Sequence, residues 1–416
     1  MIERNPAFDN LAAGYLFPEI GKRRRAYAAA HPEAKIISLG IGNTTEPLTP
    51  HIAAAMADYA KGLGTVAGYS GYGDDSAGEP PLREKIASVL YDGMIEADEV
   101  FVSDGAKCDV GRIQQLFGAN VSVAVQDPAY PVYVDGSVMV GAAGKTPATV
   151  AGYQDIVYMP CLPENNFFPD LSVVKPDSLI YFCSPNNPTG AVATKEQLQQ
   201  LVDFAKKNGC IIIFDSAYSA FIRDENLPKT IFQIEGAKEC AIEINSFSKP
   251  AGFTGVRLGW SIVPKALKFA DGTPVQALWS RLINTFFNGA SNIAQAGGLA
   301  ALDPEGVQEM RQLTDFYLEN AALIKKALEG ENFRAAGVVG DGIFAVGPVK
   351  NQIERTDAFF IFKSNGGIAG SPFALQNSLI EQERNAGKAF VVRDDIGAGD
   401  VFSLLFGSFR SLGLCF

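Results

Sequence analysis

Between residues 99 and 263, short apolar segments alternate with helix-like segments, and this alternation constrains the fold more than any other feature. The segments 179–183 and 210–214 are apolar throughout, which is typical of strands buried on both faces. Between them, Thr194 and Gln197 have the spacing of a helix capping box. The pattern predicts an α/β fold in which helices cover both faces of a mainly parallel sheet.

Polar side chains follow the ends of three predicted strands. Asn187, Asp215 and Lys249 each come shortly after an apolar segment. In sheets of this kind, ligands bind at the carboxyl ends of the strands. We therefore expect these three side chains to lie close together and to form one site.

The composition is that of a globular protein, with 47% hydrophobic and 19% charged residues. A net charge of -11 argues against nucleic acid or an anionic membrane as the main partner. No stretch holds the ~18 apolar residues of a membrane span, and the first residues do not form a signal peptide. The six cysteines form no CxxC pair, so we expect a soluble protein in a reducing compartment.

Lys249 lies on a short loop after the apolar segment 240–244, and phosphate-binding groups flank it. Ser246 and Ser248 offer neutral donors, and Arg257 offers a planar charged guanidinium. A lysine held away from water beside another cation has a lowered pKa, so its neutral amine can attack an aldehyde. Pyridoxal phosphate carries both an aldehyde and a phosphate. The alternative interpretation is an ordinary surface lysine in a loop rich in serine and glycine.

Other segments offer groups for the same cofactor. Asp215 ends a buried strand, where its carboxylate can pair with a pyridinium nitrogen, although a helix cap or a surface turn is its ordinary role. Tyr218 and Asn187 can hydrogen-bond the ring hydroxyl, and Tyr130 can stack on the ring or belong to the core. The segment 105–107 opens a helix whose backbone N–H groups suit a phosphate.

Three motifs occur in an order that is typical of one family. They are SPNNPTG at 184–190, DSAY at 215–218 and SFSKPAGFTGVRLGW at 246–260. In these motifs the chain resembles the fold-type I pyridoxal-phosphate aminotransferases. A narrower resemblance, to the branch that acts on diaminopimelate, rests on NLAAGYLF (10–17), GIGNTT (40–45), SGYGDD (70–75), SDGAKCD (103–109), QDPAYPVY (126–133) and FFNGASNIAQAG (286–297). The match covers roughly residues 5 to 330.

The length of 416 residues suggests two domains, and the resemblance implies how they are organised. It implies a large domain with a mainly parallel seven-stranded sheet between helices, and a smaller α+β domain. We expect an N-terminal arm and part of the small domain over residues 1–40, the large cofactor-binding domain over 41–300, and the small C-terminal domain over 301–416, which is atypical after about residue 330. A homodimer is implied, in the cytoplasm or, if a transit peptide has been removed, in the plastid stroma.

The resemblance also implies roles for individual residues. Lys249 holds the cofactor and moves the substrate proton, and Asp215 and Tyr218 are the other catalytic residues. The implied cofactor-binding residues are Tyr72 (from the partner subunit), Ala106, Lys107, Tyr130, Asn187, Asp215, Tyr218, Ser246, Ser248, Lys249 and Arg257. The implied substrate-binding residues are Tyr15, Gly42, Asp75, Lys107, Tyr130, Asn187, Asn288 and Arg393. Asp75 is expected to pair with the distal ammonium of a diamino acid. With two histidines in the whole chain, no metal site is expected.

The last quarter of the chain departs from the family pattern. The family has a GEGFVR-like strand whose arginine binds the substrate α-carboxylate, whereas GKAFVVR at 387–393 places its arginine one position later. Arg393 is the candidate for this contact, Arg384 and Arg410 are alternatives, and the contact can also be missing. The GAGD sequence at 397–400 resembles the anion hole of ribokinase-type sugar kinases, with Asp400 as the base. The rest of a kinase domain does not fit into the ~85 residues left.

The reaction implied by the resemblance exchanges an amino group between glutamate and tetrahydrodipicolinate, and it gives LL-diaminopimelate and 2-oxoglutarate for lysine biosynthesis. One alternative is another α-amino-acid aminotransferase on the same fold. A second alternative is a pyridoxal-phosphate-binding protein without turnover, whose contact to the substrate carboxylate was lost with the altered tail. Absorbance spectra and half-reactions with each amino acid distinguish these possibilities.

Overall fold

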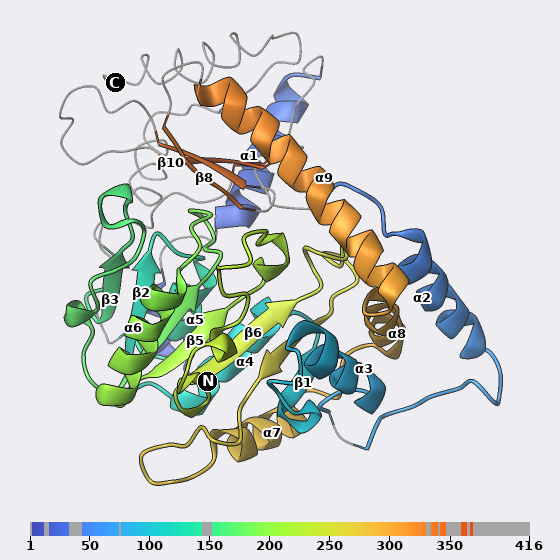
Figure 1. Cartoon of the computed structure of the whole chain (residues 1–416). Coiled ribbons are helices and arrows are strands. Elements are labelled where there is room, and N and C mark those ends of the chain that lie inside the picture. The colour runs from blue at the N-terminus through green and yellow to red at the C-terminus, as the bar shows by residue number, and fades with distance from the viewer. Residues whose placement is uncertain are drawn as a thin grey trace.

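The computed structural model describes residues 2–11, 16–32, 44–74, 76–143 and 152–329, and the short segments 334–339, 342–346, 359–363 and 367–368. Helices surround a large sheet, and a long helix leads from it to a smaller sheet (Figure 1). Within these segments, no helix is both long enough and apolar enough to cross a membrane.

Seven strands form the large sheet, in the order β1-β7-β6-β5-β4-β2-β3. They are β1 (Val100–Ser103), β2 (Ser122–Asp127), β3 (Ile156–Pro160), β4 (Ser178–Cys183), β5 (Ile211–Asp215), β6 (Ala241–Ser246) and β7 (Gly259–Ile262). Strands β2 to β6 pair in parallel, whereas β7 is antiparallel to both neighbours, β1 and β6. The loop that joins β6 to β7 spans residues 247–258 and carries Lys249. The predicted mainly parallel sheet is confirmed.

Helices cover both faces of this sheet (Figure 1). The α-helices among the described residues are α1 (Leu16–Ala30), α2 (Pro50–Gly62), α3 (Pro80–Lys85), α4 (Ala106–Phe117), α5 (Val132–Met139), α6 (Lys195–Lys207), α7 (Val275–Phe286), α8 (Asn292–Ala301) and α9 (Pro304–Glu329). Successive side chains of β5 divide between the faces, as the pleat requires. Ile213 packs in one core with α4, α5 and α7, whereas Ile212 and Phe214 pack in another core with α3, α6 and α8.

The start of α6 follows the predicted capping box. Thr194 Oγ1 accepts a hydrogen bond from the backbone N–H of Gln197 (3.2 Å), and Gln197 Oε1 accepts one from the N–H of Thr194 (2.9 Å). A cap of this kind typically stabilises a helix by about 1 kcal/mol. The capping box therefore fixes where the chain turns back after β4, and so it fixes the length of the loop that carries Asn187.

Helix α9 connects the region around α8 with a four-stranded antiparallel sheet. That sheet consists of β8 (Arg334–Val339), β9 (Gly342–Val346), β10 (Phe359–Lys363) and β11 (Gly367–Ile368). The hydroxyl of Tyr317, within α9, accepts hydrogen bonds from the backbone N–H groups of Thr45 and Glu46, each at 3.0 Å. These hydrogen bonds hold the segment that contains Thr45 and Glu46 against α9.

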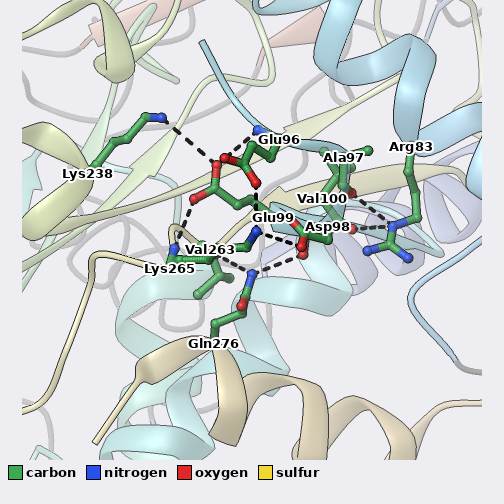
Figure 2. Close-up of polar contacts among 10 residues, drawn as sticks. All are labelled: Arg83, Glu96, Ala97, Asp98, Glu99, Val100, Lys238, Val263, Lys265 and Gln276. Atoms are coloured by element: carbon green, nitrogen blue, oxygen red, sulfur yellow. Dashed lines mark hydrogen bonds and ion pairs between the residues drawn. The ribbon is translucent and has the colours of Figure 1, made fainter. Parts of the chain in front are cut away.

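Polar contacts anchor the start of the edge strand β1 (Figure 2). The Glu99 carboxylate accepts hydrogen bonds from the backbone N–H groups of Glu96 (3.0 Å) and Lys265 (2.9 Å). The Nζ atom of Lys265 lies 2.6 Å from the Glu96 carboxylate and 2.7 Å from that of Asp98. Because Lys265 follows β7, these contacts hold β1 in place, and its other end, Ser103, leads directly into the site described next.

Candidate active site

The loops after β1, β4, β5 and β6 begin at the same edge of the sheet. The register aligns the last residues of β4 and β5, Cys183 and Asp215. It also pairs Ser246 of β6 and Ser103 of β1 with the same residue of β7, Gly259. These loops, together with the strand and helix ends next to them, carry most of the site residues that the sequence predicted and the structure describes.

Ser246, Ser248 and Arg257 form one cluster in the loop between β6 and β7. Ser246 Oγ donates a hydrogen bond to Ser248 Oγ (2.9 Å), and Arg257 Nη1 donates to the same oxygen (3.4 Å). Arg257 adopts a φ of 70°, in the left-handed region that is uncommon for residues other than glycine. A second hydrogen bond, to the carbonyl of Thr254 (3.2 Å), fixes its guanidinium. The loop thus brings two hydroxyls and one cation together.

Gly105 allows the guanidinium of Arg257 to approach the start of α4. The glycine has a φ of +118°, and a Cβ at this position would lie 2.4 Å from Arg257 Nη2. Helix α4 begins at Ala106, and no side chain caps its first turn. The N–H groups of a helix start and a nearby guanidinium both attract an anion. We call Ser246, Ser248, Arg257 and the N–H groups of the segment 105–107 the anion cup.

Three charged residues support the anion cup from α4 and the loop before it. Arg112 donates two hydrogen bonds to the Asp104 carboxylate, at 2.6 and 3.1 Å. Partial burial opposes ionisation of Asp104, but Arg112 outweighs it and lowers the pKa of that carboxyl. Asp109 is fully buried and accepts a hydrogen bond from Ser103 Oγ (2.7 Å), and burial raises its pKa to about 7. Ser103 Oγ in turn accepts a hydrogen bond from the N–H of Gly105 (3.3 Å).

Asp215 is a buried carboxylate, only 7% exposed. Its Oδ2 accepts a hydrogen bond from the Tyr133 hydroxyl (2.7 Å), and its Oδ1 accepts one from the N–H of Ala217 (3.0 Å). Burial raises the pKa of the Asp215 carboxyl, although the two hydrogen bonds oppose this shift. Among the residues that the structure describes, no cation forms an ion pair with it. Because burial disfavours the ionised form of a carboxylate, a positively charged partner would stabilise that form.

Lys249 and the tyrosines Tyr218 and Tyr130 belong to the same region as Asp215. The Nζ atom of Lys249 lies 5.7 Å from the ring centroid of Tyr218, which is within cation–π range. Tyr130 meets the ring of Tyr133 edge to face, with centroids 5.8 Å apart. Through Tyr133, Tyr130 is therefore linked to Asp215. The structure thus places an amine, three aromatic rings and a buried carboxylate in the loops and element ends at this edge of the sheet.

Two residues of this region were not predicted from the sequence. Tyr133 holds Asp215, and its only sequence signal was its place at the end of the QDPAYPVY stretch. Asn186 anchors the loop of the half-buried Asn187: its Nδ2 donates to the carbonyl of Pro128 (3.2 Å) and to Thr189 Oγ1 (3.0 Å). The buried Oδ1 of Asn186 has no partner among the described residues. The hydrogen bond from Asn186 to Pro128 connects the loop after β4 to the loop after β2.

The remaining predicted residues lie farther out or outside the described residues. Tyr72 is 87% exposed, on the segment that follows α2. Asn288 follows Phe287, whose ring lies 4.2 Å from the guanidinium carbon of Arg112, so the chain after α7 reaches the α4 side of the site. Lys107 is exposed on the first turn of α4, and burial raises the pKa of the nearby Asp135 to about 6, although the charge of Lys107 opposes this shift. The predictions that lie outside the described residues concern Tyr15, Gly42, Asp75, Arg384, Arg393, Asp400 and Arg410.

The fold and this arrangement of loops belong to a known class of enzyme. The model of the family "Aminotransferase class I and II" matches residues 34–361, and the chain belongs to this family. It is an aminotransferase with the fold-type I architecture, as the sequence predicted.

The relatives point to one member of the class. The chain is 55% identical, over 372 residues, to the LL-diaminopimelate aminotransferase of Protochlamydia amoebophila (strain UWE25), covering 89% of this chain and 90% of that protein. It is 56% identical, over 324 residues, to a protein of Arabidopsis thaliana named LL-diaminopimelate aminotransferase, chloroplastic, covering 78% and 70%. The solved structure of L,L-diaminopimelate aminotransferase from Chlamydomonas reinhardtii superposes with a TM-score of 0.82 at 49% identity, covering 92% of this chain and 98% of that one.

Proposed function

We propose that this chain is a pyridoxal-phosphate-dependent LL-diaminopimelate aminotransferase. It would interconvert tetrahydrodipicolinate and glutamate with LL-diaminopimelate and 2-oxoglutarate in lysine biosynthesis. The observation that carries the chemistry is the buried Asp215 carboxylate, which has no cationic partner among the described residues and lies one strand away from the loop of Lys249. The names of the relatives carry the choice of substrate.

The residues of the site fit this cofactor group by group. A phosphate suits the anion cup, where a side chain at position 105 would fill the space used by the guanidinium. A protonated ring nitrogen would supply a positive charge opposite Asp215, which has no cationic partner among the described residues. The aldehyde suits the amine of Lys249, which lies in the same loop as Ser248. When bound, pyridoxal phosphate supplies an electron sink for the bond at the substrate α-carbon.

The proposed roles of the side chains follow from their surroundings. Asp215 stays ionised opposite a cationic ring nitrogen and is kept in orientation by Tyr133. Burial and the charge of Asp215 raise the pKa of the Tyr133 hydroxyl, which therefore remains a donor. Lys249 would act as the general base that takes the proton from the substrate α-carbon, and it would deliver that proton to the cofactor carbon. The ring of Tyr218 keeps the amine of Lys249 close to the site.

The other predicted roles belong to the same proposal. Tyr72 would contribute to the site of a second subunit in a homodimer, which suits its exposure in the single chain. Arg393 would bind the α-carboxylate of the substrate, and Asp75 the distal ammonium of the diamino acid. The large domain would span residues 41–300, and the small domain would combine residues 301–416 with part of 1–40. The compartment would be the cytoplasm or, as the name of the plant relative suggests, the plastid stroma.

Covalent labelling tests the proposal. The full-length protein is loaded with pyridoxal phosphate, reduced with borohydride and digested, and we expect the pyridoxyl label on the peptide that contains Lys249. A label on Lys107 would overturn the assignment. Half-reactions are then followed by absorbance with LL-diaminopimelate and with glutamate. Both should convert the cofactor to its amine form, and Lys249→Ala should abolish this conversion whereas Lys268→Ala should not. Conversion by other amino acids but not by LL-diaminopimelate would favour a different aminotransferase, and no conversion by any would favour a binding protein without turnover.

A further inference from the structure

Another buried carboxylate lies on the opposite face of the sheet from Asp215 and has no role in the site described above. Glu243, in β6, is 0% exposed. Its Oε1 accepts hydrogen bonds from the hydroxyls of Tyr91 and Ser216, each at 2.7 Å. Its Oε2 accepts hydrogen bonds from Thr230 Oγ1 (2.5 Å) and from the backbone N–H of Ile231 (3.2 Å). Among the described residues, no cation pairs with this carboxylate.

Burying a carboxylate at this position costs free energy. The strand is buried on both faces, and the side chains around Glu243 belong to a hydrophobic core that includes Phe214, Phe232 and Trp260. An apolar residue would fill such a position without the loss of hydration that a carboxylate suffers. Four donors, two for each oxygen, compensate for that loss. Such a complete set of donors indicates that the group holds its neighbours in defined orientations.

One of these neighbours is joined directly to the candidate catalytic carboxylate. Ser216 is the residue after Asp215 and is also fully buried. Its backbone N–H donates to the carbonyl of Ile244 (2.9 Å), and its hydroxyl donates to Glu243. The next N–H, that of Ala217, donates to Asp215 Oδ1. Because side chains alternate between faces, Glu243 holds Ser216 from one face while Asp215 points to the other.

We propose that Glu243 is a positioning residue, which acts through Ser216 to fix the loop after β5 and thereby the direction of the Asp215 carboxylate. The proposal rests on the proposed role of Asp215. The hydroxyl of Ser216 is the link, because it is the group through which the Glu243 carboxylate reaches this loop. Without that hydrogen bond, Ser216 keeps its contacts to Ile244 and the hydrogen bond that its carbonyl accepts from the N–H of Ser219 (2.8 Å), so fewer contacts orient the peptide that presents the N–H of Ala217.

The other oxygen of the same carboxylate offers a matched control. Thr230 donates a hydroxyl hydrogen bond to Glu243 just as Ser216 does, and it is also buried. Its remaining hydrogen bonds among the described residues are local, to Gln233 and Phe232 of the short helix Ile231–Gln233. In the part of the chain that the structure describes, it forms none with the segment 216–218. Removing either hydroxyl costs Glu243 one donor, but only the change at Ser216 touches the loop that follows Asp215.

The test compares Ser216→Ala with Thr230→Val in the full-length protein. The measurements are the dissociation constant of pyridoxal phosphate, the pH midpoint of the absorbance change of the bound cofactor, kcat and KM for glutamate, and the melting temperature of the cofactor-free protein. We expect Ser216→Ala to raise the dissociation constant and lower kcat by about tenfold each, with KM within about twofold, and to shift the pH midpoint. Thr230→Val should lower the melting temperature at least as much but leave the other quantities within about twofold of wild type.

The outcomes separate this proposal from the one on which it rests. Equal effects of the two variants on cofactor affinity and kcat would show that the Glu243 network only stabilises the fold. If Asp215→Asn binds the cofactor as wild type does and keeps its activity, the role of Asp215 is wrong and this inference is wrong with it. If Asp215→Asn is impaired but Ser216→Ala is not, only the positioning role is refuted. Glu243→Gln should follow Ser216→Ala with a larger drop in melting temperature, because its amide N–H groups would face donors.

Discussion

Replacing Asp215 by asparagine removes a charge while keeping the hydrogen bonds around it. The asparagine oxygen can still accept from the N–H of Ala217, and its amide group can donate to the oxygen of Tyr133 at the 2.7 Å separation seen for the carboxylate. The buried carboxylate has no described cationic partner, so the cofactor-free variant should have an equal or higher free energy of unfolding than wild type. The loss should therefore be confined to the function with cofactor bound.

The size of that loss follows from electrostatics. Two unit charges about 4 Å apart, at an effective dielectric constant of about 20, attract one another by about 4 kcal/mol. If the pairing of Asp215 with a ring nitrogen is fully used in the transition state, its removal lowers the rate by about a thousandfold. If the pairing is weaker in the transition state, the loss of rate is smaller. A loss of less than about tenfold, or ~1.4 kcal/mol, is too small for the proposed role.

The assay is the half-reaction with glutamate, followed by cofactor absorbance after rapid mixing. Asp170→Asn is the matched control, because it is the same chemical change on an exposed residue that only caps a short helical turn and accepts a hydrogen bond from the N–H of Ser172. We expect the control to react at the wild-type rate. An Asp215→Asn variant that binds the cofactor and loses less than about tenfold of its rate would refute the electrostatic reasoning.

Three further predictions concern the surroundings of the site. Gly105→Ala should raise the dissociation constant of pyridoxal phosphate at least tenfold, because its Cβ would displace the Arg257 guanidinium. Gly111→Ala is the control: it lies within α4 with open space around it, so it should leave the dissociation constant unchanged. Burial raises the pKa of Asp109 to about 7, so the folded cofactor-free protein keeps a proton that the unfolded chain releases near pH 4, and stability falls as pH rises between these values. Urea unfolding of wild type and Asp109→Asn tests this. Between pH 5 and pH 8, the free energy of unfolding should fall by about 3 kcal/mol less in the variant than in wild type. If the two proteins differ by the same amount at both pH values, the raised pKa is contradicted. Arg393→Ala should weaken both glutamate and LL-diaminopimelate without changing the cofactor spectrum, and Arg393→Lys should recover little; wild-type half-reaction rates would move the assignment to another arginine.

Much of the fold could be predicted because several strands carried their own signal. The segments 179–183 and 210–214 are apolar throughout, and a strand with this pattern has to be buried on both faces. Once the sheet is mainly parallel, the residues after the strand ends lie at one edge, which is why Asn187, Asp215 and Lys249 could be grouped from the sequence. Local patterns therefore determined both the layers and the location of the site.

The supporting contacts could not be predicted because they join distant parts of the chain. Tyr133 is one of several buried residues of α5, and its hydrogen bond to Asp215 depends on how that helix packs. Glu243 lies in a segment, 240–244, that was interpreted simply as apolar. Its donors come from Tyr91, Ser216 and Thr230, and the contact to Tyr91 spans 152 positions of sequence. A single sequence shows a charged residue in such a strand, but it does not show the partners.

The pairing of β1 with β7 has a consequence for the order in which this protein can be made. Among the described residues, β1 is one of the two edge strands of the large sheet, and the strand that pairs with it, β7, begins only at Gly259. While the ribosome is synthesising the residues between them, the buried residues Val100–Ser103 have left the exit tunnel without the strand that will pair with them. Unpaired apolar strands of this kind are where nascent chains associate wrongly or recruit chaperones. The anion cup, which needs the loops after both β1 and β6, is therefore a late product of folding and cannot guide its early steps.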